Sequence, residues 1–301
     1  MMPDGDVAEG IVVKRSPILG LALLLAAAVP AAAETFAETR AVWNQPEKPF
    51  RIIGNIYYVG TKELAVYLIR TPDGDILIDR GLPEGAALIE HNIESLGVPL
   101  SAVKVLLNSH AHFDHAGGLA RIKADSGAKL YASAGDAPIL ERGHIDFGPS
   151  STIDFPPAKV DRVLKDGDTV ALGGAVLTAH LTPGHTPGCT SWTMPVTEAG
   201  KSLNVIFYCS TTVAGNPLVG NAAEPHIVSE YRHSFAVLKR IKADVFLAPH
   251  ASFYDPQKKL AERKAGGPDP FVDPGELQRF VAASEKAFDE ELAKQSAKAA
   301  R

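Results

Sequence analysis

One run of ten residues narrows the possible folds and chemistry of this chain more than any other segment. It is Ser109-His110-Ala111-His112-Phe113-Asp114-His115-Ala116-Gly117-Gly118. It places three imidazoles and one carboxylate within six positions. His110 and His112 alternate, so a strand end or an extended loop can direct both side chains to one point. Asp114 and His115 follow at once, where a turn can direct them to a second point. Two clustered ligand sets predict a two-metal site.

Nitrogen and carboxylate ligands suit Zn²⁺ best, with iron or manganese as alternatives. The competing interpretation is a solvated, histidine-rich turn that holds no metal. The flanking sequence disfavours that interpretation, because 103–108 reads as a buried strand and Gly117-Gly118 follows the run. His185 and His250 also follow apolar segments that read as strands.

The composition allows one large hydrophobic core. The chain has 301 residues, 46% of them hydrophobic, and a formal net charge of −5. That length and apolar content are enough for a single domain over 34–301. A mildly acidic surface argues against nucleic acid as a partner. A monomer is the default expectation for the oligomeric state.

The first 33 residues have the pattern of a secretory signal peptide. Lys14 and Arg15 form a basic region, 17–29 an apolar region, and Ala31-Ala32-Ala33 fits the small-residue cleavage rule. A membrane anchor is the alternative, but the apolar stretch is too short to span a bilayer comfortably. We therefore expect a mature start near Glu34 and a periplasmic protein without stable membrane association.

Cys189 and Cys209 are the two cysteines of the chain. Both lie near His185, in predicted adjacent strands, and an oxidising compartment permits a disulfide between them. Two buried thiols, or Cys209 as the neighbour of a metal, are the alternatives.

Strands and helices alternate without a regular strand–helix–strand period. We expect strands at 52–59 (interrupted by a glycine), 64–70, 75–79, 103–108, 130–133, 190–194, 203–208 and 244–250. Hairpins are expected around the Asp-Gly turn at 71–74 and within 169–181, and a long loop at 143–161. Helices are expected at 83–96, 117–124, 230–243 and 275–298. The order predicts an α/β fold in which two mixed sheets are flanked by helices, with the histidines at one sheet edge.

The pattern His110-x-His112-x-Asp114-His115, followed by His185 and His250, resembles the metallo-β-lactamase superfamily. The finer sequence resembles subclass B3 over nearly the whole mature chain. The segments that carry this likeness are 43–50, 109–118, 181–192 and 247–250. The resemblance implies the four-layer αβ/βα sandwich of that superfamily.

The resemblance also implies two zinc ions per chain. The first would be held by His110, His112 and His185. The second would be held by Asp114, His115 and His250. The implied reaction is hydrolysis of the β-lactam amide of penicillins, cephalosporins or carbapenems by a metal-bound hydroxide, which confers antibiotic resistance. Asp114 would also act catalytically by orienting the hydroxide.

Other hydrolases of this superfamily, such as lactonases and thioesterases, are the alternative function. Many of them bridge the two metals with an aspartate after a strand that corresponds to 205–208. Here Cys209-Ser210-Thr211-Thr212 follows and offers no carboxylate. The likeness to subclass B3 assigns Ser210 and Thr212 to binding the substrate carboxylate, and makes Cys209 a non-ligand. The alternative for both hydroxyls is the capping of backbone groups in a turn.

Asp79 ends a predicted strand and is a candidate partner for a metal-bound imidazole; its alternative role is to cap a turn. Subclass B3 enzymes often have Gly-Gly after this aspartate, whereas Arg80-Gly81 follows here. This departure is expected to alter the turn or to add a surface charge.

The remaining histidines are expected to be surface or partly buried residues: His91, His144, His180, His226 and His233. Of these, His144 lies in the long loop and could face the substrate. Ile145, Phe147 and Phe155 share that loop, either as an apolar wall of the site or as loop packing. Apolar residues at helical spacing in 277–292 predict a terminal helix packed inward.

Overall fold

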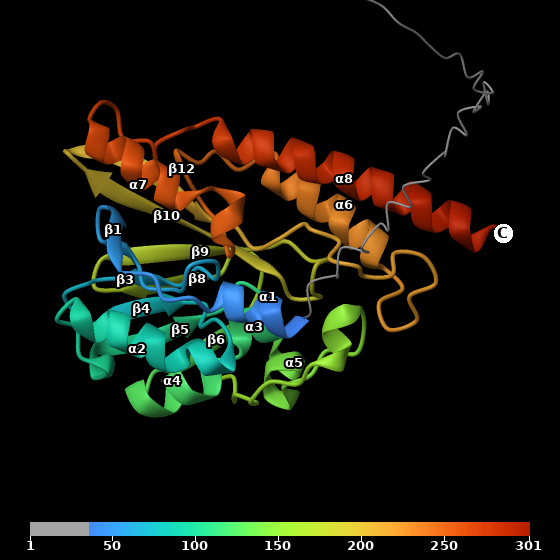
Figure 1. Cartoon of the computed structure of the whole chain (residues 1–301), viewed down its shortest axis with the longest axis horizontal. Helices are drawn as coiled ribbons and strands as arrows, with labels where there is room; N and C mark the ends of the chain where they lie inside the picture. The colour runs from blue at the N-terminus through green and yellow to red at the C-terminus, as the bar shows by residue number, and fades with distance from the viewer. Residues whose placement is uncertain (1–35) are drawn as a thin grey trace, which may run out of the picture. The chain divides into compact units, whose positions relative to one another are not determined.

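Two mixed β-sheets, each covered on its outer face by helices, make up the part of the chain that the computed structural model describes, residues 36–301 (Figure 1). This confirms the predicted four-layer arrangement. The predicted signal peptide, 1–33, lies outside the described residues. Within 36–301, no helix has the length and apolar character needed to cross a membrane.

The first sheet has seven strands in sequence order. They are β1 (Phe50–Ile53), β2 (Ile56–Tyr58), β3 (Tyr67–Ile69), β4 (Asp75–Ile78), β5 (Val103–Leu107), β6 (Lys129–Ser133) and β7 (Arg162–Leu164). The pairs from β1 to β4 are antiparallel and those from β4 to β7 are parallel. Strands β3, β4 and most of β5 are buried on both faces, as a sheet between two layers requires.

The second sheet has the order β12-β11-β10-β9-β8. Its strands are β8 (Thr169–Leu172), β9 (Ala175–Leu181), β10 (Thr190–Glu198), β11 (Lys201–Phe207) and β12 (Val245–Leu247). All of its pairs are antiparallel except β11 with β12. Burial alternates along β9 and β10, so one face of this sheet is packed and the other is partly exposed.

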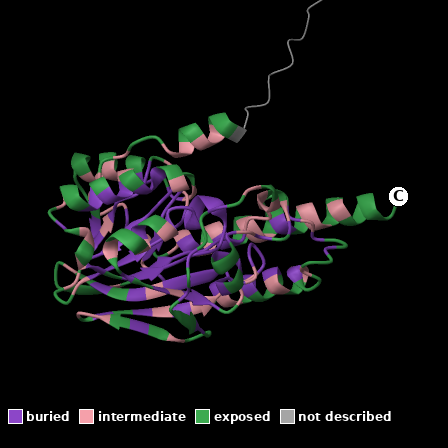
Figure 2. Cartoon of the chain, turned by 90° about the horizontal axis from the view of Figure 1, so that it is seen from below, coloured by how far each residue is buried: buried purple, intermediate pink, exposed green. Residues whose placement is uncertain are grey.

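The helices of the described residues are α1 (Phe36–Trp43), α2 (Ala86–Ser95), α3 (Phe113–Ala116), α4 (Leu119–Ser126), α5 (Ala137–Arg142), α6 (Ile227–Leu238), α7 (Pro256–Ala265) and α8 (Glu276–Ala299). Most of them lie on the outer faces of the two sheets (Figure 1). Short 3₁₀ turns occur at Pro83–Gly85, Leu100–Ala102, Pro149–Thr152 and Ala251–Phe253. Figure 2 shows that buried residues concentrate in the strands and on the inner faces of the helices.

One predicted strand is wrong. The segment 52–59 is not a single strand, because β1 and β2 form an antiparallel hairpin that turns at Gly54 and Asn55. Gly54 has a φ of +51°, and a Cβ there would lie 2.0 Å from Val196 Cγ2. Only glycine fits this turn against β10.

Helices α5 and α7 were not expected from the sequence, for two physical reasons. Helix α5 has only six residues, too few to show a helical apolar period, and it follows β6 after three residues. Helix α7 is strongly polar and buries only Pro256 and Lys259, so it has no apolar stripe. The start of α7 does have a sequence signal, because the N-cap residue type Asp255 is followed by Pro256 in the first turn. In the structure the Asp255 side chain accepts from the Lys258 amide.

Candidate metal centre

The six residues predicted as metal ligands converge on one place. His110 and His112 follow β5, and Asp114 and His115 lie in the single turn of α3, which starts directly after His112. His185 follows β9 and His250 follows β12. The ligand-type atoms of His110, His112 and His185 lie within 4.8 Å of one another, as do those of His110, Asp114 and His115. His250 completes the cluster, with its Nε2 3.2 Å from His115 Nε2.

Gly117 and Gly118 allow this arrangement by close packing. A Cβ on Gly117 would lie 2.3 Å from Pro83 Cδ, and one on Gly118 would lie 2.5 Å from the Arg80 carbonyl. Arg80 N–H in turn donates to the His115 carbonyl at 2.9 Å. The glycine pair therefore lets α3 and its ligands lie directly against the loop that follows β4.

Hydrogen bonds fix the tautomer of His110. The Ser109 hydroxyl donates to Asp79 Oδ2 at 2.6 Å, and the Ser109 amide donates to Asp79 Oδ1 at 2.7 Å. Because the Ser109 hydroxyl proton already lies in the bond to Asp79, Ser109 Oγ can only accept from His110 Nδ1, at 2.9 Å. The proton of a neutral His110 ring therefore sits on Nδ1, and Nε2 presents a lone pair to the cluster.

His185 is fixed in the same tautomer. Its Nδ1 lies 2.7 Å from the Thr212 carbonyl, which can only accept, so Nδ1 carries the proton. The Nε2 atoms of His185 and His110 are then 3.2 Å apart with lone pairs facing each other. Two ligands of a tetrahedral Zn²⁺ with bonds of about 2.0–2.1 Å have about this separation. A cation between the rings fits this pair, whereas the rings alone repel.

A second group of ligand atoms surrounds Asp114. Its Oδ2 lies 3.3 Å from His115 Nε2 and 3.4 Å from His250 Nε2. His250 Nδ1 faces Glu63 Oε1 at 3.3 Å, a carboxylate that can only accept. Each imidazole thus turns Nε2 toward the carboxylate, and two nitrogens with one oxygen form a second donor set for a divalent metal.

Burial and charge set the protonation of the cluster. Burial, with the neighbouring imidazoles, holds the pKa of His110 and His185 well below the ordinary value, and burial lowers the pKa of His112 to about 4. These three rings are neutral, as metal ligands must be. Burial alone would raise the pKa of Asp114, but His115 and His250 outweigh it and hold this pKa well below its usual range.

Two buried nitrogens in the cluster are unsatisfied within the described structure. His112 Nε2 and His115 Nδ1 have no hydrogen-bond partner there. His115 Nδ1 points at Asp79 Oδ2 from 3.6 Å, which is longer than a hydrogen bond. Unpaired buried polar atoms are uncommon, and at a functional site such atoms fit the binding of an ion. The donor set, its spacing and these atoms all fit a metal centre.

Asp79 is buried and sits where a partner of the metal-bound imidazoles was predicted. It connects to His110 through Ser109 and faces His115 directly. The expectation that Arg80 adds a surface charge is wrong, because its side chain is fully buried, with 0% exposed. Arg80 Nη1 donates to the Leu107 carbonyl, and burial lowers its pKa to about 9.

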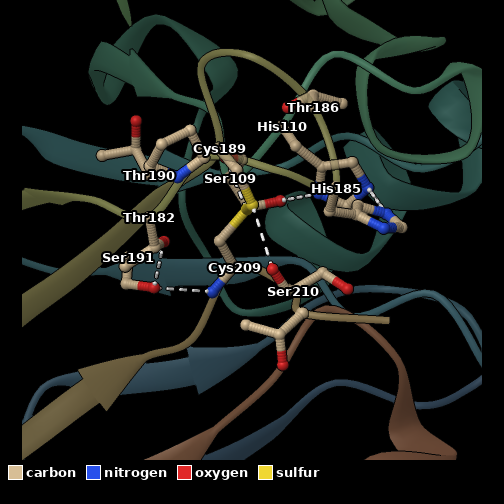
Figure 3. Close-up of a disulfide and its surroundings, with 12 residues drawn as sticks. Ser109, His110, Thr182, His185, Thr186, Cys189, Thr190, Ser191, Cys209 and Ser210 are labelled. Carbon is tan, nitrogen blue, oxygen red and sulfur yellow. Dashed lines mark hydrogen bonds between the residues drawn. A yellow bond between two sulfur atoms is a disulfide. The ribbon is translucent and has the colours of Figure 1, made fainter. Parts of the chain in front are cut away.

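A disulfide joins Cys189 and Cys209, the pairing that the sequence left as one of three alternatives. Cys189 follows His185 by four residues and Cys209 directly precedes Ser210. Figure 3 shows the bond beside His110 and His185. The disulfide therefore ties the loop that carries His185 to the segment that carries Ser210, and it leaves Cys209 without a thiolate to offer a metal.

A buried carboxylate that sequence reasoning missed, Asp136, holds two ligand loops together. Its Oδ1 accepts from the Gly188 amide at 2.8 Å, and its Oδ2 accepts from the Thr186 hydroxyl at 3.1 Å. The backbone of Ala111, between His110 and His112, also hydrogen-bonds to it. Burial raises the pKa of Asp136 to about 7 despite these donors.

A cavity of about 610 Å³ opens over the cluster. It is lined by Trp43, His110, His112, Phe113, Asp114, Pro149, Ser150, Thr152, Ile153, His185, Ser210, Thr212, Ala214 and His250. The predicted binding residues Ser210 and Thr212 are both in this lining. The size suits a small-molecule ligand, and Trp43, Phe113 and Ile153 make part of the wall apolar.

Other parts of the long loop do not reach the cavity. Ile145, Phe147 and Phe155 are buried and absent from its lining, so loop packing accounts for them. His144 is partly exposed and its Nδ1 lies 2.7 Å from Asp154 Oδ1. Pro149, Ser150, Thr152 and Ile153 of the loop line the cavity instead, which apolar content alone did not indicate.

Several residues around the site carried no recognisable signal in the sequence. Glu63, Asp136 and Asn216 each contact a ligand or its loop from a distant part of the chain. Trp43, by contrast, begins the segment 43–50 that resembles subclass B3, and its ring centre lies 5.5 Å from that of His250. Ser109 also had a signal in the sequence, because it directly precedes His110 in the run that predicts the metal site.

Known proteins are similar to this chain in sequence and fold. The sequence model of the metallo-beta-lactamase superfamily matches residues 64–250. BJP-1, a subclass B3 metallo-β-lactamase of Bradyrhizobium japonicum, is 47% identical with a TM-score of 0.81, covering 85% of this chain and 97% of that one. FEZ-1 metallo-β-lactamase from Legionella gormanii is 42% identical with a TM-score of 0.81, covering 84% of this chain and 98% of that one.

Curated sequences give a shorter match. A hydroxyacylglutathione hydrolase of Hyphomonas neptunium is 33% identical over 141 residues, which are 47% of this chain and 47% of that protein. The chain thus spans about half the length of this relative. The superfamily match covers more than half of the chain and includes all six converging residues. By its sequence, its fold and its clustered ligands, the chain belongs to the metallo-β-lactamase superfamily.

Proposed function

We propose that the chain is a β-lactam hydrolase of the B3 type that works with two zinc ions. The observation that carries this proposal is the chemistry of residues 208–212, the segment after β11. Cys209 is in a disulfide, Ser210 and Thr212 line the cavity, and no residue from 208 to 212 has a carboxylate. A neutral wall with hydroxyl donors suits a substrate that brings its own carboxylate, as β-lactam antibiotics do. The likeness to solved B3 enzymes supports the same function.

The ligands divide into two sets. One zinc ion would be held by His110, His112 and His185, and the other by Asp114, His115 and His250. When bound, zinc supplies a water of lowered pKa and polarises the carbonyl that is attacked. Asp114 turns Oδ2 toward His115 and His250, so its other oxygen can accept a hydrogen bond from the attacking water and orient it.

Ser210 and Thr212 would hold the substrate carboxylate. Their hydroxyl oxygens lie 3.0 Å apart, so one hydroxyl donates to the other. The second hydroxyl proton is then free to donate to a carboxylate oxygen. The Thr212 amide also donates to Ser210 Oγ at 3.2 Å, so the two side chains shape the turn as well. Shaping the turn and binding the carboxylate are compatible, because the serine oxygen accepts one hydrogen bond while its proton is donated in another.

A thioesterase is the second candidate function. The observation that favours it is the match of part of the chain to hydroxyacylglutathione hydrolases. A glutathione thioester is longer than a β-lactam and carries two carboxylates, whereas the Ser210 and Thr212 hydroxyls would hold one. Among the described residues, the cavity lining has neither lysine nor arginine that could pair with a second carboxylate, which favours the β-lactam.

The test is a comparison of kcat/KM for a penicillin, a cephalosporin, a carbapenem and an S-acylglutathione, with zinc-loaded protein. We expect turnover of at least one β-lactam and little or none of the thioester. Ser210→Ala should raise KM for the best β-lactam by roughly tenfold and change kcat less, since a lost hydrogen bond to a charged group costs about 1.5 kcal/mol or more. An unchanged KM would remove Ser210 from the binding site.

We also propose a periplasmic location after removal of residues 1–33, and a role in antibiotic resistance. The pattern of Lys14-Arg15, an apolar stretch and Ala31-Ala32-Ala33 supports the location. Fractionation of cells that express the full chain, with N-terminal sequencing of the mature protein, tests it. A start near Glu34 in the periplasmic fraction is expected.

A further inference from the structure

The wall of the substrate cavity is built from segments that have little regular structure. Residues 208–226, between β11 and α6, contain neither helix nor strand. Ser210, Thr212 and Ala214 of this segment line the cavity. A segment of this kind has few internal backbone hydrogen bonds, so groups from outside it must hold its shape.

Asn216 connects this segment to the metal centre and to the opposite wall. Its side chain is buried, and Nδ2 donates to the His185 carbonyl at 3.1 Å. A Cβ on Gly148 would lie 2.1 Å from Asn216 Oδ1, and a Cβ on Gly215 would lie 2.8 Å from Pro149 Cγ. The segment around Asn216 therefore packs tightly against the 3₁₀ turn that forms the other side of the cavity.

Gln295, near the end of α8, holds the backbone on both sides of Pro217. Its Oε1 accepts from the Leu218 amide at 2.7 Å, and its Nε2 donates to the Asn216 carbonyl at 3.1 Å. The amide group thus pairs with two backbone groups as a neighbouring strand would. Its Nε2 also lies 3.1 Å from Glu291 Oε1, one turn back on α8, which fixes the orientation of the side chain.

We propose that Gln295 is a positioning residue that fixes the cavity wall at 210–218, and through it the binding of substrate. Nothing in Gln295 touches the cavity, whose lining does not include it. Gln295 on α8 holds the Asn216 backbone, the Asn216 side chain holds the His185 carbonyl, and the neighbouring Gly215 packs against Pro149. The effect on substrate binding rests on the proposed function, whereas the effect on the wall does not.

The same helix offers a matched control. Gln278 is also half-buried on α8, and its Nε2 donates to the carbonyls of Leu238 and Ile241 at 3.2 and 2.9 Å. These bonds connect α8 to the end of α6, and none of the three residues lines the catalytic cavity. Replacing either glutamine by alanine removes two hydrogen bonds to the backbone, so general loss of stability is comparable.

The experiment compares Gln295→Ala with Gln278→Ala in the zinc-loaded protein, first by hydrogen–deuterium exchange. We expect faster exchange in peptides that cover 211–219 for Gln295→Ala alone. Equal exchange there in the wild type and Gln295→Ala would overturn the proposal. Because exchange needs no substrate, this arm decides the role of Gln295 even if the wild type hydrolyses no β-lactam, a result that would contradict only the proposed function.

Steady-state kinetics form the second arm. Gln295→Ala should raise KM for a β-lactam roughly fivefold, the effect of about one net hydrogen bond, with kcat within about twofold. Gln278→Ala should leave KM unchanged, whereas Gln295→Glu, whose carboxylate would face the Asn216 carbonyl and Glu291 Oε1 without a proton to donate, should raise KM at least as much as Gln295→Ala. A KM that rises equally in Gln278→Ala would overturn the link to substrate binding and indicate general loosening.

Discussion

At the scale of single residues, hydrogen bonds at Nδ1 decide what the site histidines can bind. His110 donates to Ser109 and His185 donates to the Thr212 carbonyl. Each bond leaves Nε2 with a lone pair, and the two lone pairs face each other across 3.2 Å. A cation between them turns this repulsion into ligation. The partners of Nδ1 therefore matter to metal binding almost as much as the ligands do.

Ser109→Ala should weaken zinc binding by about 10- to 100-fold, because His110 loses the acceptor that fixes its tautomer. Competition with a chromophoric chelator measures the affinity. Ser126→Ala is the control, since Ser126 Oγ donates to the Ile122 carbonyl within α4, away from the site. Equal zinc affinity in the wild type and Ser109→Ala would show that the Asp79–Ser109 connection has no role in metal binding.

Asp136 gives a prediction about pH. Burial raises its pKa to about 7, whereas an unfolded aspartate has a pKa of about 3.9. Between about pH 4 and 7 the native state keeps a proton that the unfolded chain releases. The contribution of Asp136 to the free energy of unfolding therefore falls as pH rises through this window.

The Asp136→Asn variant has no titratable proton at this position. Its free energy of unfolding, minus that of the wild type, should rise from pH 4.5 to pH 7.5 by a few kcal/mol at most, since one pKa unit is worth about 1.4 kcal/mol. Urea unfolding of the chelated proteins at both values measures the difference, and chelation removes the pH dependence of metal binding. A constant difference would mean that Asp136 is ionised throughout the window.

Four of the six predicted ligands could be grouped from the sequence for a reason that does not apply to the residues that support them. His110, His112, Asp114 and His115 are close in sequence, so local geometry alone brings them together. Asp136 and its partners around 186–188 are about fifty residues apart, and only the packed fold brings them together. A single buried aspartate has no local pattern that separates it from a turn residue.

At the scale of elements, most strands and helices followed from apolar periodicity. The strands at 75–79 and 103–108 and the terminal helix are present as predicted. The hairpin at 50–58 was not, because the apolar run Ile52–Val59 hides a turn that depends on contact with the other sheet. Polar α7 was missed since periodicity detects buried faces, and this helix has almost none.

Gly54→Ala should cost about 2–4 kcal/mol of unfolding free energy. The new Cβ meets Val196 Cγ2 at 2.0 Å and the residue keeps a left-handed φ. Gly97→Ala is the matched control, because Gly97 has a φ of +72° but nothing within 4 Å of its Cβ position, so it should lose only about 1 kcal/mol. Urea unfolding compares them, and equal losses would mean that the contact with β10 is unimportant.

At the scale of the whole molecule, the two sheets contribute different halves of the site. The elements after β5 supply His110 through His115, and the loops after β9 and β12 supply His185 and His250. The Cys189–Cys209 disulfide ties the end of β11 to the loop that carries His185. The centre exists only when both sheets are packed together, so metal binding and the native fold are linked.

The most direct test of the proposed two-zinc hydrolase is β-lactam hydrolysis by chelated protein during titration with zinc. Chelated protein should be inactive, and added zinc should restore hydrolysis while two equivalents bind per chain. His112→Ala should not recover under the same titration, because it lacks a ligand of the first set. Protein that binds two zinc ions and hydrolyses no penicillin, cephalosporin or carbapenem would contradict the proposed β-lactam hydrolase function.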